Sequence, residues 1–270
     1  MYLALHGIIT NKIQLSLDAD AQAFVTASGI SDPVQISAID NLVKDLKAAS
    51  LWTKFKAIWP FVGGTESRHK WNLKDPRDLD AAFRLVFYGG WTHSSTGALP
   101  NAVNGYANTF IVPKDVFANF NIAVGVYSRT DVIGYQNEMG VRPPTGASDQ
   151  FNILPRHSGS FFGDLTFERR VSSTNSSSTG FQIISRISST DVRIYRNTTQ
   201  LAQNTSSLTR PLSNQTLPLA LSAMNNNGTN EGYSGREKAL AFVSVGLTSA
   251  EISTLNTINT TFQTALSRNV

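Results

Sequence analysis

Cysteine is absent from this chain of 270 residues. The absence excludes disulfide bonds, thiolate metal sites and cysteine nucleophiles. Charged residues are also scarce, at 16% of the chain, which is below the usual share of about a quarter. Asparagine, serine and threonine take their place, so we expect a surface solvated largely by small uncharged groups.

Long apolar runs and clusters of basic residues are missing as well. No window of about eighteen apolar residues occurs, so no transmembrane segment is expected. The net charge is +4, but the lysines and arginines are scattered along the chain. Without a basic run, we predict no specific binding of nucleic acid.

Helix signals are present near the beginning of the chain, where residues 18–50 are predicted to form a helical hairpin. The first helix should end at Gly29, a residue type typical of the position just past a helix. The second should start with Asp32 as its N-cap and Pro33 in its first turn. Apolar residues follow at helical spacing, which gives this helix one apolar face.

The long middle of the chain has a pattern of many short strands. Turn-rich stretches separate them and no helical pattern alternates with them, which favours an antiparallel sandwich or barrel over a parallel α/β sheet. The predicted strands are residues 55–59, 85–88, 108–111, 120–128, 132–135, 150–153, 159–162, 181–188, 191–196, 217–224 and 238–245.

The end of the chain carries a well-specified helix. Thr248 is its predicted N-cap and Glu251 the third residue of a capping box, with Leu247 and Ile252 as a hydrophobic staple. We therefore divide the chain into three parts. Residues 1–50 form an arm and a helical hairpin, proposed as a docking element. Residues 51–246 form the sandwich, and residues 247–270 form a helix packed on it.

Catalytic carboxylates were sought because sandwiches of this size include glycoside hydrolases. The strand motif E-x-D-x-x-E is absent. Asp164 and Glu168 come nearest, but four strand positions span about 13 Å, beyond the roughly 5–9.5 Å that paired carboxylates need. We expect a surface pair beside Arg169 and Arg170, predict no catalytic residue, and predict that the protein is not an enzyme.

Metal binding has little support in the sequence. The four histidines have no ligand spacing, and His69 and His93 are expected to make hydrogen bonds in loops that flank the core. We therefore predict no metal site and no cofactor. Calcium alone is left open, because Asp131, Asp149, Asp191 and the 225–227 asparagine run could supply oxygen ligands.

The most distinctive loop lies at residues 89–109. It places Trp91, His93, Asn104 and Tyr106 among glycines and serines. An aromatic ring can stack on the apolar face of a sugar while an amide bonds its hydroxyls, so these four residues are our candidate glycan site. The competing interpretation is that Trp91 and Tyr106 pack beneath the loop.

A family resemblance adds to this picture. The segments at residues 51–64 (LWTKFKAIWPFVGG), 69–76 (HKWNLKDP) and 89–109 (GGWTHSSTGALPNAVNGYANT) resemble a module of phage and prophage structural proteins. The helical lead-in from residue 18 and the final strand and helix also match it. The resemblance implies a concanavalin A-like (laminin-G type) jelly roll, a mainly β antiparallel sandwich with an N-terminal helical hairpin and a C-terminal helix.

The resemblance also implies a role. Modules of this kind occur in virion proteins of the tail, fibre or capsid surface. We therefore expect a non-enzymatic virion subunit that acts through assembly contacts with other virion proteins and as a homo-oligomer, trimeric if fibre-like. Adhesion to a host-surface glycan is a further role left open. The alternatives are a soluble lectin-like carbohydrate-binding domain and a glycan depolymerase.

Overall fold

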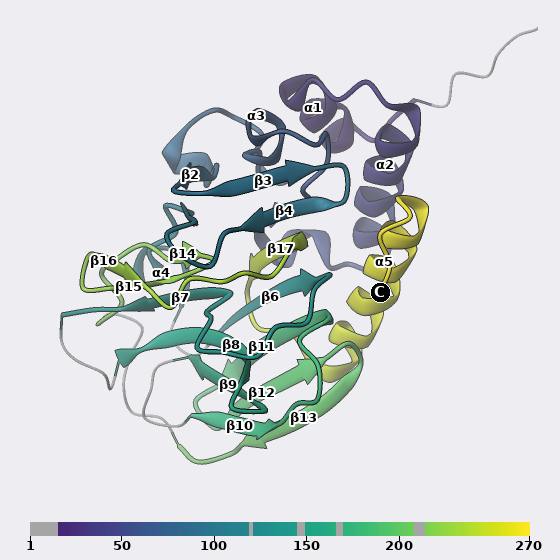
Figure 1. Ribbon diagram of the computed structural model, residues 1–270. Coiled ribbons are helices and arrows are strands. Elements are labelled where there is room, and N and C mark those ends of the chain that lie inside the picture. The colour runs from purple at the N-terminus through teal and green to yellow at the C-terminus, as the bar shows by residue number, and fades with distance from the viewer. Residues whose placement is uncertain (1–15, 119–120, 145–148, 166–169, 208–213) are drawn as a thin grey trace, which may run out of the picture.

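The computed structural model describes residues 16–118, 121–144, 149–165, 170–207 and 214–270. The fold is mainly β, and two sheets form an antiparallel sandwich, as predicted. Five α-helices are described, and three of them lie along one flank of the sandwich (Figure 1). The helices are α1 (Ala19–Ser28), α2 (Pro33–Ala48), α3 (Glu66–His69), α4 (Pro113–Val116) and α5 (Ser249–Ala265), and short 3₁₀ turns cover Trp52–Lys54 and Asp80–Ala82.

The first sheet has eight strands. Its spatial order is β13 (Thr199–Asn204), β12 (Asp191–Arg196), β11 (Gly180–Ser188), β6 (Ile122–Ser128), β17 (Lys238–Ser244), β4 (Gly97–Pro100) and β3 (Trp91–Ser94). The eighth strand, β1 (Phe55–Trp59), also pairs with β17.

The second sheet has nine strands. Its main order is β10 (Val171–Thr174), β9 (Ser160–Leu165), β8 (Phe151–His157), β7 (Met139–Arg142), β14 (Ala220–Leu221), β5 (Tyr106–Asn108) and β2 (Val86–Tyr88). A hairpin of β15 (Met224–Asn226) and β16 (Thr229–Glu231) joins it, with β15 parallel to β7. Strand β2 is therefore an edge strand of this sheet.

The core between the sheets is filled by side chains from both inner faces. Trp59, Phe151 and Phe161 are fully buried there together with Ile184 and Ile194. Close packing also explains Gly163, where a Cβ atom would lie 2.6 Å from the side chains of both isoleucines.

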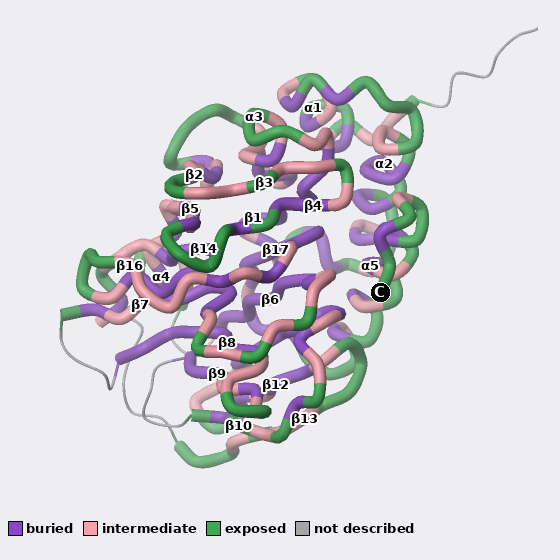
Figure 2. Tube along the Cα trace, viewed as in Figure 1, coloured by how far each residue is buried: buried purple, intermediate pink, exposed green. Residues whose placement is uncertain are grey.

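A second hydrophobic core lies on the other face of the eight-stranded sheet. Helices α1, α2 and α5 each contribute buried residues to it (Figure 2), and Phe24, Leu42 and Phe262 from the helices join Phe181 and Phe242 from the strands. The central strands of this sheet are consequently buried on both faces, which explains their continuous apolar runs.

The predicted helix caps are confirmed, although α5 ends at Ala265 and does not run to residue 270. The Asp32 side chain accepts a hydrogen bond from Val34 N at 2.8 Å, and Gly29 has the left-handed conformation with φ of 64°. Thr248 and Glu251 form the reciprocal capping box that the sequence predicted. These caps fix where α1, α2 and α5 start or stop.

Several strand predictions were wrong in detail. Residues 132–135 are not a strand. The predicted strand at 217–224 is broken at Ser222, whose φ of 68° ends β14 before β15 begins. The loop predicted at 89–109 contains all of β3, β4 and β5. Asparagine, glycine and serine concealed these short strands, since such residues are usually read as turns.

Candidate functional site

The four residues of the predicted glycan site lie on three different segments of the fold. Trp91 and His93 lie on β3, whereas Tyr106 lies on β5 of the other sheet and Asn104 in the loop between. The described structure gives each of them a different environment.

Trp91 has a structural role. Its indole Nε1–H donates to the carbonyl oxygens of Tyr88 and Tyr106, at 3.1 and 3.2 Å, and its ring packs against Phe87 with the centroids 5.1 Å apart. The indole therefore links β2 to β5 and positions the backbones of the two tyrosines. This arrangement resembles the competing interpretation, in which Trp91 packs beneath the loop.

Asn104 holds the loop in shape. Its side-chain oxygen accepts hydrogen bonds from Gly90 N at 3.0 Å and from Asn101 Nδ2 at 2.9 Å. A Cβ atom on Gly89 would lie 2.1 Å from the Asn104 carbonyl oxygen. The glycines of this loop thus allow a close approach of two backbone segments.

His93 pairs with His69. Their Nδ1 atoms lie 2.9 Å apart, so one neutral ring donates to the other. Both residues belong to regular elements, β3 and α3, and not to the loops expected from sequence. Burial lowers the pKa of His69 to about 3 and that of His93 to about 4, and the neighbouring His93 and Arg268 contribute to the shift of His69. The two rings are therefore neutral near pH 7.

Tyr106 is the predicted residue that lines a hollow. Its ring stacks on Tyr88, its cross-strand neighbour, with centroids 5.0 Å apart and planes 14° from parallel. Tyr106 also borders a hollow of about 160 Å³ on the outer face of the nine-stranded sheet. Its lining residues are Tyr106, Asn108, Pro218, Leu219, Ala220, Asn225, Gly228 and Asn230.

The hollow beside Tyr106 offers both apolar and polar contacts. Asn225 is engaged with the protein, since its Nδ2 donates to Pro218 O at 2.9 Å. Asn230 Oδ1, in contrast, is buried without a hydrogen-bond partner. Burial raises the pKa of the Tyr106 phenol, as do Tyr88 and Tyr233, while Asn230 acts in the opposite direction. The phenol therefore stays protonated and able to donate a hydrogen bond.

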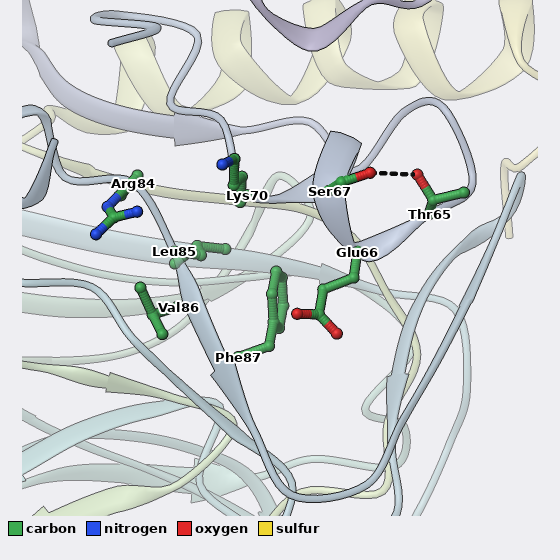
Figure 3. Close-up of a pocket in the computed structure, with 8 residues that line it drawn as sticks. All are labelled: Thr65, Glu66, Ser67, Lys70, Arg84, Leu85, Val86 and Phe87. Carbon is green, nitrogen blue, oxygen red and sulfur yellow. Dashed lines mark hydrogen bonds between the residues drawn. The ribbon is translucent and has the colours of Figure 1, made fainter. Parts of the chain in front are cut away.

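A larger hollow, of about 500 Å³, lies along the edge strand β2. Figure 3 shows Glu66 extending from α3 toward Phe87, with Lys70 and Arg84 on the other side. The two basic groups are paired with carboxylates that do not line the hollow: Lys70 Nζ lies 2.6 Å from Asp78, and Arg84 Nη2 lies 2.8 Å from Asp80.

Asp164, predicted to belong to a carboxylate pair on the surface, does not lie on the surface. Asp164 is fully buried, Arg170 Nη2 lies 2.8 Å from its Oδ2, and Gln150 donates to the same oxygen at 3.1 Å. The expectation was wrong because Asp164 lies on the sheet face at a position covered by its neighbours. Glu168 and Arg169 lie outside the described residues.

The proposed calcium donors are occupied by protein partners. Asp131 accepts from Ser178 N at 2.8 Å and pairs with Arg156, and Asp191 pairs with Arg193 at 2.7 Å. In the parts of the chain that the structure describes, no three His, Asp or Glu side chains gather in a way that could hold a metal ion. Nor does any described helix have the length and hydropathy needed to cross a membrane.

Sequence reasoning missed Tyr88, Asn108 and Asn230. Asn108 could have been found, because Tyr106 and Asn108 are two positions apart and so share one face of a strand, whereas Tyr88 reaches Tyr106 only through the pairing of β2 with β5. Asn230 could not, since the β15–β16 hairpin brings it to Tyr106 from more than a hundred residues away in sequence.

Comparisons with known proteins support the fold. No family model matches the sequence, and no curated protein matches it. Among solved structures, domain 4 of AbnA, a GH43 extracellular arabinanase from Geobacillus stearothermophilus, is similar to this chain with a TM-score of 0.50 and 10% identity. The match covers 75% of this chain and 98% of that domain.

Two sialidase structures are similar at lower scores. The CBM40 of the Ruminococcus gnavus IT-sialidase has a TM-score of 0.43 and 10% identity, over 63% of this chain and 94% of that one. The NanB sialidase from Streptococcus pneumoniae has a TM-score of 0.45 and 14% identity, over 61% of this chain. The match spans 27% of the NanB chain.

Proposed function

We propose that this protein is a concanavalin A-like lectin, a sandwich that binds carbohydrate and does not cleave it. The observation that carries the proposal is the hollow beside Tyr106, where an aromatic ring borders a recess lined by Asn108, Asn225 and Asn230. In this proposal the binding residue from our predicted set is Tyr106, and Trp91 acts by positioning it.

The chemistry of this hollow suits a sugar. One face of the Tyr106 ring is taken by Tyr88, and the Tyr233 ring lies at a 45° tilt with its centroid 6.4 Å away. The part of the Tyr106 ring that borders the hollow can contact the apolar face of a sugar ring. The amide groups around it can bond hydroxyls.

Two further points support binding over catalysis. The AbnA domain, whose fold is similar to this one, has a solved structure in complex with arabinotriose. The described residues that line the hollow also include no carboxylate, whereas glycoside hydrolysis generally uses a pair of them.

A glycan array followed by calorimetry tests the proposal. Wild-type protein should bind at least one glycan, and Tyr106→Ala should weaken its affinity about tenfold or more, equivalent to about 1.4 kcal/mol. Tyr135→Ala is the control, because Tyr135 is a solvent-accessible tyrosine, 44% exposed, that does not line the hollow. Absence of binding to any glycan at millimolar concentration would count against a lectin.

We also propose, from the resemblance of residues 51–109 to phage modules, that the protein is carried on a virion as a homo-oligomer. Residues 1–50 remain our proposed docking element, although α1 and α2 already have a structural use, since they cover the eight-stranded sheet. Mass spectrometry of purified particles tests the location, and crosslinking identifies the neighbour. A protein found only outside the particles would contradict this second proposal.

A further inference from the structure

The two hollows described above are neighbours. Val86 lines the larger one and Asn108 lines the smaller one. These residues are directly opposed in the β2–β5 pair, so their side chains lie on the same face about 5 Å apart. The two recesses therefore border the same pair of strands.

An aromatic ridge runs beside this junction. Tyr88 stacks on Tyr106 and is 45% exposed. Because β2 is an edge strand, no described strand of the sheet lies beyond it to separate the ridge from the larger hollow. A chain-like ligand could thus leave the smaller hollow, cross Tyr88 and pass over the sheet edge at Val86.

Among the described residues that line the larger hollow, Glu66 carries the charge that is not offset by an ion pair. The Glu66 carboxylate makes no ion pair or side-chain hydrogen bond with any described residue, and Figure 3 shows it directed into the recess. Lys70 and Arg84 are balanced by Asp78 and Asp80. Glu66, Lys70, Arg84, Asp78 and Asp80 together carry a net charge of −1, from two positive and three negative groups.

We infer that the ligand is an oligosaccharide that occupies both hollows, and that it is neutral or basic, not acidic. The inference rests on the proposed lectin function. One sugar unit lies against Tyr106, the chain crosses Tyr88, and a later unit donates hydroxyl or ammonium hydrogen bonds to Glu66. An acidic sugar would place a second negative charge beside this unpaired carboxylate, which is unfavourable.

The test is the dependence of affinity on ligand length. The probes are the mono-, di- and tetrasaccharide of the neutral glycan with the strongest array signal, with tetragalacturonic acid as the acidic comparison. Calorimetry should give wild-type protein about tenfold higher affinity for the tetrasaccharide than for the disaccharide, and weaker binding of the acidic probe. Glu66→Ala should remove this gain and leave disaccharide binding unchanged.

Asp45→Ala is the control, since Asp45 is an exposed carboxylate on α2, away from both hollows. Thermal unfolding of both variants verifies that they fold. Equal affinity for the di- and tetrasaccharide, a gain that survives Glu66→Ala, or tighter binding of the acidic probe would overturn the inference and leave a lectin with one hollow. Failure of every sugar to bind would overturn the proposed function itself.

Discussion

The outer faces of the two sheets differ in what covers them. On the eight-stranded sheet the outer face is apolar, and Phe181 and Phe242 are fully buried beneath helices. On the nine-stranded sheet the outer face carries Tyr88, Tyr106 and Asn108, and the last two border a recess. The comparison shows that an apolar face needs a cover, whereas a polar face with a few aromatics can remain open to a ligand.

Removing a side chain from the covered face should have the largest effect. Phe242 packs edge-on against Phe55 and Phe181, with centroids 5.3 and 5.6 Å apart. Phe242→Ala should lower the free energy of unfolding by about 3–5 kcal/mol, since it removes buried area and leaves a cavity. Urea denaturation measures it.

The open face supplies the matching control. Tyr88→Ala should cost much less, about 1 kcal/mol or below, because the ring is nearly half exposed. If both variants lose similar stability, the distinction between a structural face and a binding face is wrong.

Acid should destabilise the junction between the two sheets, where His69 and His93 meet. Their folded pKa values, about 3 and about 4, lie below the ordinary value of 6.5, so the unfolded chain binds more protons between these limits. The contribution of these two histidines to the free energy of unfolding is therefore fully present above pH 6.5. It falls as the pH is lowered toward 4, by at most about 1.4 kcal/mol per pH unit for each proton.

Unfolding measured between pH 7 and pH 5 isolates this effect, because most carboxylates stay ionised in that range. His93→Gln should be less stable than wild type at pH 7 but should show a shallower loss on acidification. An unchanged slope would mean that the pair does not control acid sensitivity.

A small change in the free energy of unfolding is expected at the N-terminus of α5, one of the helices that cover the eight-stranded sheet. Thr248→Ala removes the N-cap of α5 and should cost about 1 kcal/mol without changing sugar affinity on the open face. Thr254→Ala, an exposed change within the same helix, should cost nothing, since alanine favours helix. Loss of sugar binding in Thr248→Ala would show that the two faces are coupled.

The parts of the fold that could be predicted from the sequence are those that depend on interactions between residues close together in the chain. Asp32 with Pro33, Gly29, and Thr248 with Glu251 each satisfy backbone groups within a few residues, so their spacing identifies the helix ends. Strand β12 likewise begins and ends at the predicted residues.

The candidate site could be predicted only in part, because it depends on pairing between distant segments. Tyr106 was found from its residue type. Trp91 was assigned to the sugar because nothing local reveals that its indole N–H is used by the Tyr88 and Tyr106 carbonyls. The roles proposed for Glu66 and Asn230 depend on α3 lying beside the edge strand β2 and on the β15–β16 hairpin, an arrangement that only the folded chain creates.

The pairing of β1 with β17 has a consequence for how the protein folds. Phe55 lies opposite Ser244, and α2 packs on α5, so contacts link the first and last thirds of the chain. Loop-closure entropy makes such distant contacts slow to form. During synthesis on the ribosome, the part of the apolar face of α2 that packs on α5 therefore stays exposed, and prone to aggregation, until α5 has been synthesised.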